Sequence, residues 1–99
     1  MFNVRKPFYI TRGVKEEIHP VLIKEMIDSV MRLKKSVAVD YLQIFKFSQE
    51  GDKTWIEHIQ EEPAHKKTLM FKGIPNKFEE KVYIIDNGNY ITVLLADEY

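Results

Sequence analysis

The chain has 99 residues, a length typical of one domain, and no cysteine, which excludes disulfides, thiolate metal sites and cysteine nucleophiles. Its 15 basic and 15 acidic residues balance, so it lacks the basic excess of a dedicated nucleic-acid-binding domain. The first residues contain no signal-peptide pattern, and no apolar run approaches the ~20 residues that a membrane span needs. We therefore expect one cytoplasmic domain over residues 1–99, with no membrane partner.

The N-terminal part of the chain predicts one short strand. Phe8, Tyr9, Ile10 and Thr11 are aromatic or β-branched residues that follow a proline, and Arg12-Gly13 closes the run. Residues 14–18 have no clear period. Two interpretations of that segment stay open, a further extended piece or a turn.

The segment from Pro20 to Lys34 predicts an amphipathic helix. Proline suits a first helical turn, where its missing N–H group has no partner to lose. Apolar residues recur in pairs at four-residue steps, at positions 22/23, 26/27 and 30/31. This spacing gives one broad apolar stripe, which needs a second apolar surface to cover it.

After residue 37 the apolar period changes to two, which predicts strands. The predicted strands cover residues 41–47, 54–60, 67–72, 81–85 and 90–95, with a polar turn at 49–53. The last two strands flank Asn87-Gly88, a dipeptide that tolerates positive φ at both central positions of a tight turn. We therefore expect a hairpin there, with both residues in that conformation.

These elements predict an α+β fold, a mostly antiparallel sheet of about five or six strands with one amphipathic helix packed on one face. Consecutive strands joined by short turns run antiparallel, and the helix stripe and one sheet face bury each other. The chain order is one strand, the helix, and then the remaining strands. Whether the first strand lies centrally or at an edge stays open.

Side chains that commonly carry catalysis form no recognisable motif. The histidines, His19, His58 and His65, lack the i, i+2 or i, i+4 spacing of metal ligands. Acidic pairs fall in turns or near element ends, where a solvated charged rim explains them. No serine lies in a glycine-flanked nucleophile elbow, and the isolated glycines form no phosphate-binding loop. We predict that the protein is not an enzyme and uses no metal or cofactor.

Aromatic residues in the strands indicate that both sheet faces carry apolar groups. Strand alternation places Tyr41, Phe45 and Phe47 on one face, and Trp55 lies on the neighbouring predicted strand. If one helix covers one face, the aromatic residues of the other face remain available for an interface. The alternative, that the helix and loops cover everything, also stays open.

Three functional hypotheses follow from this pattern. The first is a non-enzymatic protein-interaction module that pairs with itself or another protein through aromatic residues such as Trp55, Phe45 and Phe47. The second is a small-molecule or peptide-binding domain with a groove between helix and sheet, lined by Tyr41, Trp55 and Tyr83.

The third and weakest hypothesis is nucleic-acid binding through the N-terminal segment. Basic residues surround Phe8 and Tyr9 there, a combination that can hold phosphates and stack bases. The basic residues are Arg5, Lys6, Arg12 and Lys15. An ordinary edge strand protected by positive charge is the simpler interpretation. Lys34-Lys35 and Lys66-Lys67 extend the patch only if the fold brings them together.

Four short blocks of the sequence, residues 9–14, 40–45, 85–90 and 95–99, span nearly its whole length. Together they resemble a small uncharacterised family of Gram-positive bacterial proteins, domain of unknown function 960. The resemblance implies no activity, but it directs attention to the polar and aromatic residues of these blocks, Tyr9, Arg12, Asp86, Tyr90, Glu98 and Tyr99. If the first strand lies beside the final hairpin, we expect Arg12 to pair with Asp86 or Glu98.

Overall fold

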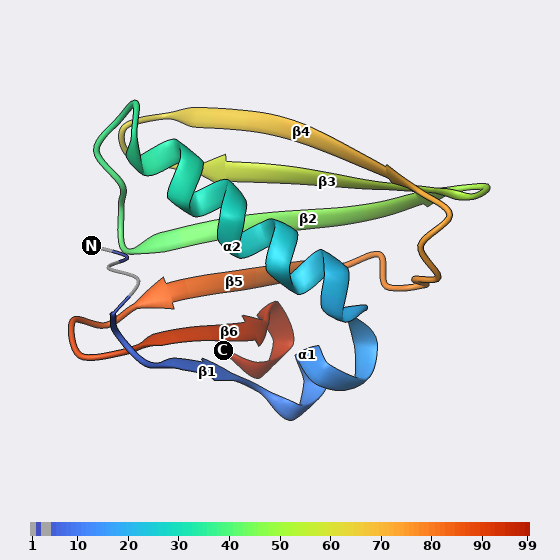
Figure 1. Cartoon of the computed structure of the whole chain (residues 1–99), viewed down its shortest axis with the longest axis horizontal. Coiled ribbons are helices and arrows are strands. Elements are labelled where there is room, and N and C mark those ends of the chain that lie inside the picture. The colour runs from blue at the N-terminus through green and yellow to red at the C-terminus, as the bar shows by residue number, and fades with distance from the viewer. Residues whose placement is uncertain (1, 3–4) are drawn as a thin grey trace.

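The predicted amphipathic helix is α2 (Pro20–Lys34) in the computed structural model, which describes residue 2 and residues 5–99. Pro20 lies in its first turn, and the Nδ1 atom of the preceding His19 accepts a hydrogen bond from the Val21 N–H at 3.1 Å. The apolar stripe is buried as predicted, with Leu22 and Met26 fully inaccessible to solvent. Helix α2 crosses the strands of one large sheet (Figure 1).

The sheet has six strands in the order β1-β6-β5-β2-β3-β4. Its strands are β1 (Phe8–Ile10), β2 (Leu42–Glu50), β3 (Lys53–Gln60), β4 (His65–Lys72), β5 (Lys81–Asp86) and β6 (Ile91–Leu95). All neighbours run antiparallel except β1 and β6, which are parallel. The predicted α+β class and mostly antiparallel sheet are therefore confirmed, and the first strand lies at an edge.

Residues 14–18 are mostly helical, so both interpretations of this segment were wrong. They belong largely to α1 (Arg12–Glu17), a short helix whose N-cap is Thr11. The Thr11 hydroxyl accepts a hydrogen bond from the Val14 N–H at 3.3 Å, and the Val14 side chain is buried in the core. This capped helix turns the chain from the edge strand β1 back towards the start of α2.

The final hairpin is confirmed, but its turn differs from the prediction. Among residues 87–90 only Gly88 has positive φ, 104°. The connection has four residues and is closed by the Asn87 N–H, which donates to the Tyr90 carbonyl at 3.1 Å. The Asp86 carboxylate also accepts from the Gly88 N–H at 2.8 Å. Because side chains satisfy the loop N–H groups, the turn does not need positive φ at Asn87.

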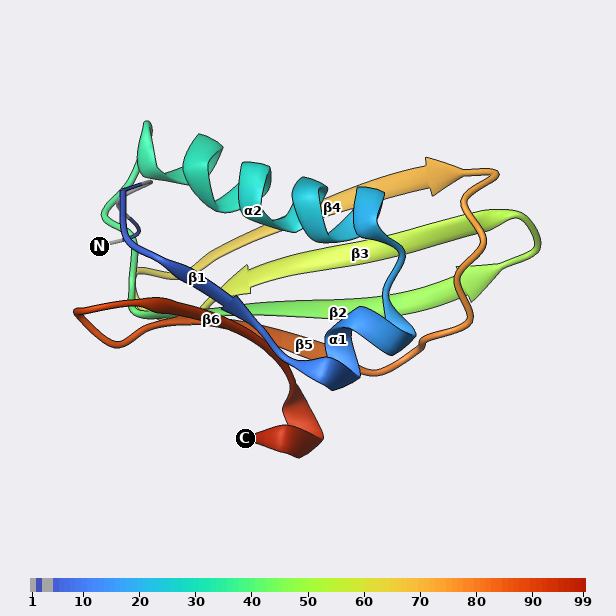
Figure 2. The same cartoon turned by 60° about the horizontal axis from the view of Figure 1, so that its bottom comes forward.

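Strand alternation divides the sheet into a covered and an uncovered face. The covered face packs against α2 and contributes Phe45, Phe47, Ile56, Val82, Ile84, Ile91 and Val93 to the core. Helix α2 lies on one side of the sheet, and the C-terminal 3₁₀ turn η1 (Ala96–Glu98) lies on the other (Figure 2). Successive side chains of a strand point to opposite faces, so every second side chain lies on the uncovered face, outside the main core. We call the face on which a strand residue lies its parity.

The parallel edge strand β1 fastens both ends of the chain to the sheet. Phe8 lies opposite Ile91, so the residues before β1 reach the β5–β6 hairpin and those after it reach the C-terminus. There the Glu98 carboxylate accepts hydrogen bonds from the Thr11 hydroxyl at 2.7 Å and the Leu95 N–H at 2.8 Å. The hydrogen bond from Thr11 makes the largest contribution to holding the pKa of Glu98 below its ordinary value.

Gly13 is the residue that permits this close approach of α1 to η1. A Cβ atom at position 13 meets the Glu98 Oε2 atom at 2.6 Å and the Leu95 Cδ1 atom at 2.9 Å. We expect Gly13→Ala to lower the free energy of unfolding by about 1 kcal/mol, because the clash outweighs the helix-favouring effect of alanine. Urea unfolding measures the change. In a Glu98→Ala background the same substitution should cost less, and an equal cost would contradict the proposed clash.

Candidate functional site

The uncovered face of the sheet carries a continuous set of large apolar side chains. In register, Ile44 of β2 lies between Ile59 of β3 and Tyr83 of β5, and Tyr83 lies opposite Leu94 of β6. These side chains are half-buried, although α2 does not cover them. The uncovered face comprises Tyr9, Leu42, Ile44, Trp55, Ile59, Met70, Tyr83, Ile85 and Leu94.

Two tyrosine pairs border this face. The rings of Tyr9 and Tyr90 meet edge to face with centroids 5.1 Å apart, and both side chains are exposed. Tyr99 packs in the same way against Tyr83, with centroids 5.7 Å apart, and is itself 70% exposed. The fold thus brings Tyr9 and Tyr90 together, whereas Trp55 lies on the same side of the sheet but with three strands between β1 and β3.

Phe45 and Phe47 were wrongly predicted as surface anchors. They are 0% and 1% exposed, because their parity in β2 directs them beneath α2. The Phe45 ring stacks on the imidazole of His58, with centroids 4.3 Å apart. Trp55 lies opposite Ser48 and Met70, on the other face.

The predicted groove lined by Tyr41, Trp55 and Tyr83 was also wrong. Trp55 and Tyr83 project from the uncovered face, away from α2. Tyr41 precedes β2 and is 45% exposed. The three side chains therefore do not meet between helix and sheet.

Arg12 pairs with neither Asp86 nor Glu98, so this expectation was wrong. Its guanidinium, 92% exposed, contacts the Glu16 carboxylate at 2.9 Å one helical turn away. Asp86 instead forms an ion pair with Lys6, with 2.8 Å between the Lys6 Nζ atom and the Asp86 Oδ2 atom. The parallel pairing of β1 places Lys6, not Arg12, beside the hairpin.

The buried Asp86 carboxylate is held ionised by its partners. Burial acts to raise its pKa, but hydrogen bonds from Lys6, from the Phe2 N–H and from the Gly88 N–H outweigh that effect, so its pKa lies below the ordinary value. Asp86 therefore ties the N-terminal segment to the final hairpin. Its contacts are those of a structural latch.

The structure joins only part of the basic patch predicted around the N-terminal segment. Lys6 is paired with Asp86 and Arg12 with Glu16. Lys34 reaches the segment and donates to the Phe2 carbonyl at 3.4 Å. Lys66 and Lys67 lie on β4, at the opposite edge of the sheet from β1, so they do not extend the patch.

A buried polar network lies beneath α2, and sequence reasoning missed it. His58 of β3 is 1% exposed and bridges two elements. Its Nδ1 atom lies 2.8 Å from the Ser29 Oγ atom of α2, and its Nε2 atom lies 2.6 Å from the Gln43 Oε1 atom of β2. The Gln43 amide donates to Gln60 at 2.7 Å. Strand alternation could have predicted their burial, because these residues lie on the same strand face as Phe45 and Ile56.

The hydrogen bonds of the network determine which ring nitrogen of His58 carries the proton. The Gln43 amide nitrogen donates to the Asp40 carbonyl, so its oxygen is free to accept from the His58 Nε2–H. The Ser29 hydroxyl then donates to Nδ1. Burial, and then the positive charges of His65, Lys67 and Arg32, lower the pKa of His58 to about 4. Ser29 is only 2% exposed, so this serine–histidine contact lacks the access that a nucleophile needs.

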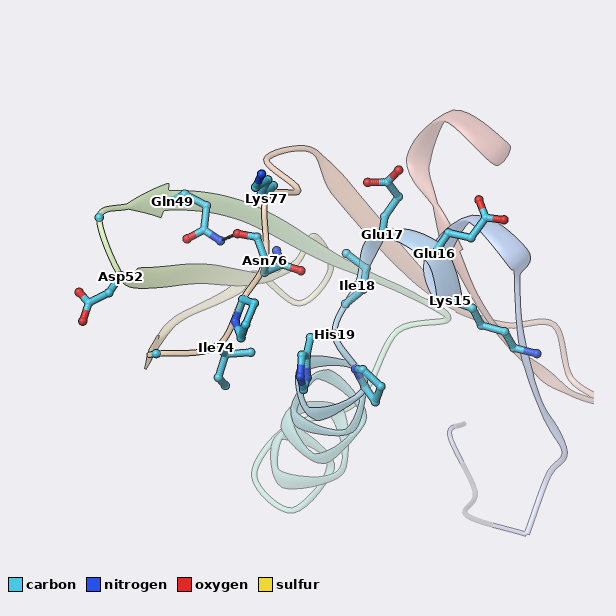
Figure 3. Close-up of a pocket in the computed structure, with 14 residues that line it drawn as sticks. Lys15, Glu16, Glu17, Ile18, His19, Gln49, Asp52, Ile74, Asn76 and Lys77 are labelled. Carbon is cyan, nitrogen blue, oxygen red and sulfur yellow. Dashed lines mark hydrogen bonds between the residues drawn. The ribbon is translucent and has the colours of Figure 1, made fainter.

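A groove of about 740 Å³ opens at the end of the molecule where α1 meets α2 (Figure 3). One wall is the α1–α2 junction with Ile18, His19 and Pro20, and the other is the segment 73–77 beside the β2–β3 turn. The Gln49 side chain donates to the Asn76 carbonyl and anchors that second wall. The Asn76 Oδ1 atom is buried and has no hydrogen-bond partner.

The described residues contain neither a membrane-spanning helix nor a cluster of metal ligands. No helix within residues 5–99 is long and apolar enough to cross a membrane. No group of three or more histidine and acidic side chains in that range is arranged to hold a metal ion.

Comparisons with known proteins assign the chain to a family. Residues 8–98 match the family described as Staphylococcal protein of unknown function (DUF960), and the chain belongs to it. A crystal structure of a protein of unknown function from Enterococcus faecalis is similar, with a TM-score of 0.83 and 19% sequence identity. The alignment covers 99% of this chain and 94% of that chain, which shows a shared fold. No curated protein matches the chain.

The neutral state of His58 makes the stability of the fold depend on pH. Its pKa falls from 6.5 to about 4 on folding, so the unfolded chain binds the proton more tightly between these values. We expect the free energy of unfolding to fall by about 3 kcal/mol from pH 7 to pH 4 through this residue alone. Urea unfolding across that range measures the loss.

His58→Leu should remove this component between pH 5 and pH 6.5, whatever its effect on absolute stability. His19→Gln, at the opposite end of α2, is the matched control and should retain it. An unchanged pH slope in His58→Leu would show that His58 is not the responsible group.

Proposed function

We propose that this protein is a non-enzymatic interaction module that self-associates through the uncovered face of its sheet. The observation that carries the proposal is the continuous apolar register across β3, β2, β5 and β6, from Ile59 through Ile44 and Tyr83 to Leu94. Monomeric proteins rarely leave an apolar patch of this kind without a partner. Tyrosine and tryptophan, which border the patch, are characteristic of interface centres.

The charges around the apolar rows favour a second copy of the chain as the partner. Lys46 and Lys81 lie side by side on one flank of the rows. Asp40 and Glu61 lie beyond the other flank, just before β2 and just after β3. Two copies can stack their uncovered faces around a two-fold axis that lies between the sheets, perpendicular to the strands. The lysines of each copy then lie opposite the acidic residues of the other.

The edge of the sheet is a less suitable surface for self-association. Strand β4 is the long free edge, and it carries exposed lysines at positions 66, 67 and 72. Lysines on an edge strand oppose strand-to-strand pairing between molecules. Face-to-face stacking of two sheets avoids this repulsion and buries the apolar rows at the same time.

Light scattering coupled to size-exclusion chromatography tests the proposal. We expect the wild-type chain to behave as a dimer at micromolar concentration. Ile44→Asp should give a monomer, because it places an uncompensated charge at the centre of the apolar rows. Val21→Asp is the matched control, since Val21 is an apolar residue of α2 that is 45% exposed on the other side of the molecule.

Urea unfolding of the separated monomer shows whether Ile44→Asp remains folded. Lys46→Glu with Lys81→Glu provides a second disruption, which Glu61→Lys should partly reverse if the proposed orientation is correct. A wild-type chain that stays monomeric at millimolar concentration would contradict self-association through this face.

A second candidate function is small-molecule or peptide binding in the groove of Figure 3. The buried Asn76 Oδ1 atom favours it, because a buried acceptor without a partner is costly and a bound donor would relieve that cost. Pro20 and Ile74 supply apolar surface on the two walls. The predicted residues Tyr41, Trp55 and Tyr83 play no part in this site.

An NMR screen with short amide-containing peptides tests the groove. Binding should shift the amide signals of Gln49 and Asn76, and Ile74→Asp should reduce affinity at least tenfold by removing an apolar wall. Shifts confined to the uncovered face, or no shifts at all, would dismiss this candidate.

A further inference from the structure

A small basic hollow lies beside the buried polar network, between the last turns of α2 and the edge strand β4. Its volume is about 110 Å³, well below that of a pocket for a drug-sized ligand. Side chains of three elements line it, and the set is Ser29, Arg32, Leu33, Ser36, His58, His65 and Lys67. The hollow is separate from both the uncovered face and the groove of Figure 3.

The strand register explains why basic side chains meet there. Lys67 lies opposite His58, and His65 lies opposite Gln60, so both project on the covered side of the sheet. Strand β4 is the outermost strand, and its covered side also carries Leu69 and Phe71, which pack against the core. Arg32, in the last turn of α2, approaches from the helix side.

No acidic residue of the described chain lines this hollow. Two other cations of the same helix and strand are paired, Lys66 with Glu57 at 3.6 Å and Lys24 with Asp28 at 2.6 Å. Asp28 is the acidic residue one turn before Arg32, and its carboxylate is already engaged by Lys24. Arg32 and Lys67 both line the hollow, and neither has an ion-pair partner among residue 2 and residues 5–99. The same charges act on the imidazole of His58 at its floor.

We propose that this hollow binds a single phosphate group, either as inorganic phosphate or as a small phosphate monoester. A guanidinium and an ammonium group from different elements match the charge and the tetrahedral shape of such an anion. The Ser29 and His58 hydrogen bond fixes the floor, so the cations converge on a rigid surface. The small volume accommodates one phosphate and excludes a longer polyanion from the floor.

Titration with inorganic phosphate, followed by NMR at constant ionic strength, tests the proposal. We expect saturable shifts of the Arg32 and Lys67 signals at millimolar phosphate, with no comparable effect of chloride. Arg32→Gln and Lys67→Gln should each weaken binding about tenfold, since each removes one charged donor. Lys66→Gln is the matched control, because Lys66 is adjacent in β4 but projects to the other face and pairs with Glu57.

A parallel titration with O-phosphoserine distinguishes the two sources of the group. Tighter binding of O-phosphoserine indicates a monoester site, and equal or weaker binding indicates a site for free phosphate; both support the proposal. Two outcomes would overturn it. One is a shift that chloride reproduces at equal ionic strength, and the other is an equal loss of binding in Lys66→Gln and Lys67→Gln.

Discussion

The structure depends on one constraint, that a single helix covers only one face of a six-stranded sheet. Helix α2 buries Leu22, Met26 and Val30 against that face, and successive side chains of each strand point to opposite faces. The parity of a residue in its strand therefore decides whether it lies in the core or on the uncovered face. Phe45 and Trp55, on neighbouring strands, are separated by this rule.

The same parity places polar residues in the core and determines their chemistry. Gln43, His58 and Gln60 occupy positions beneath α2, and each finds hydrogen-bond partners there. A fully satisfied buried network fixes relative positions more strictly than apolar packing does, because its geometry has few alternatives. Ser29 extends the network into α2, so it holds the helix above β3 and provides a rigid floor for the basic hollow.

Three surfaces result from this arrangement, and each has its own chemistry. The uncovered face is apolar and aromatic, the groove beside Asn76 is mixed, and the hollow beside Lys67 is basic. They lie on different parts of the molecule, so association through the uncovered face leaves both concave sites open. A face-to-face dimer would consequently present two copies of each site.

Local patterns along the chain predicted the main helix and the strands. The four-residue step before residue 35 predicted α2, and the alternation after it predicted the strands, since both periods follow from backbone geometry alone. They predicted Trp55, Phe45 and Phe47 as interface residues, but only Trp55 lies on the uncovered face. They did not predict α1, because a short capped helix has too few residues to show a period.

Interactions between residues close together in the chain specify the α+β class, the main helix, the strands and the final hairpin, so local patterns suffice to predict them. Contacts between distant residues establish which strand face the helix covers, the parallel pairing of β1 with β6, and the approach of Lys6 rather than Arg12 to Asp86. The same holds for the contact between Ser29 and His58, which are 29 residues apart. Such contacts depend on strand order and register, which local periodicity leaves undetermined.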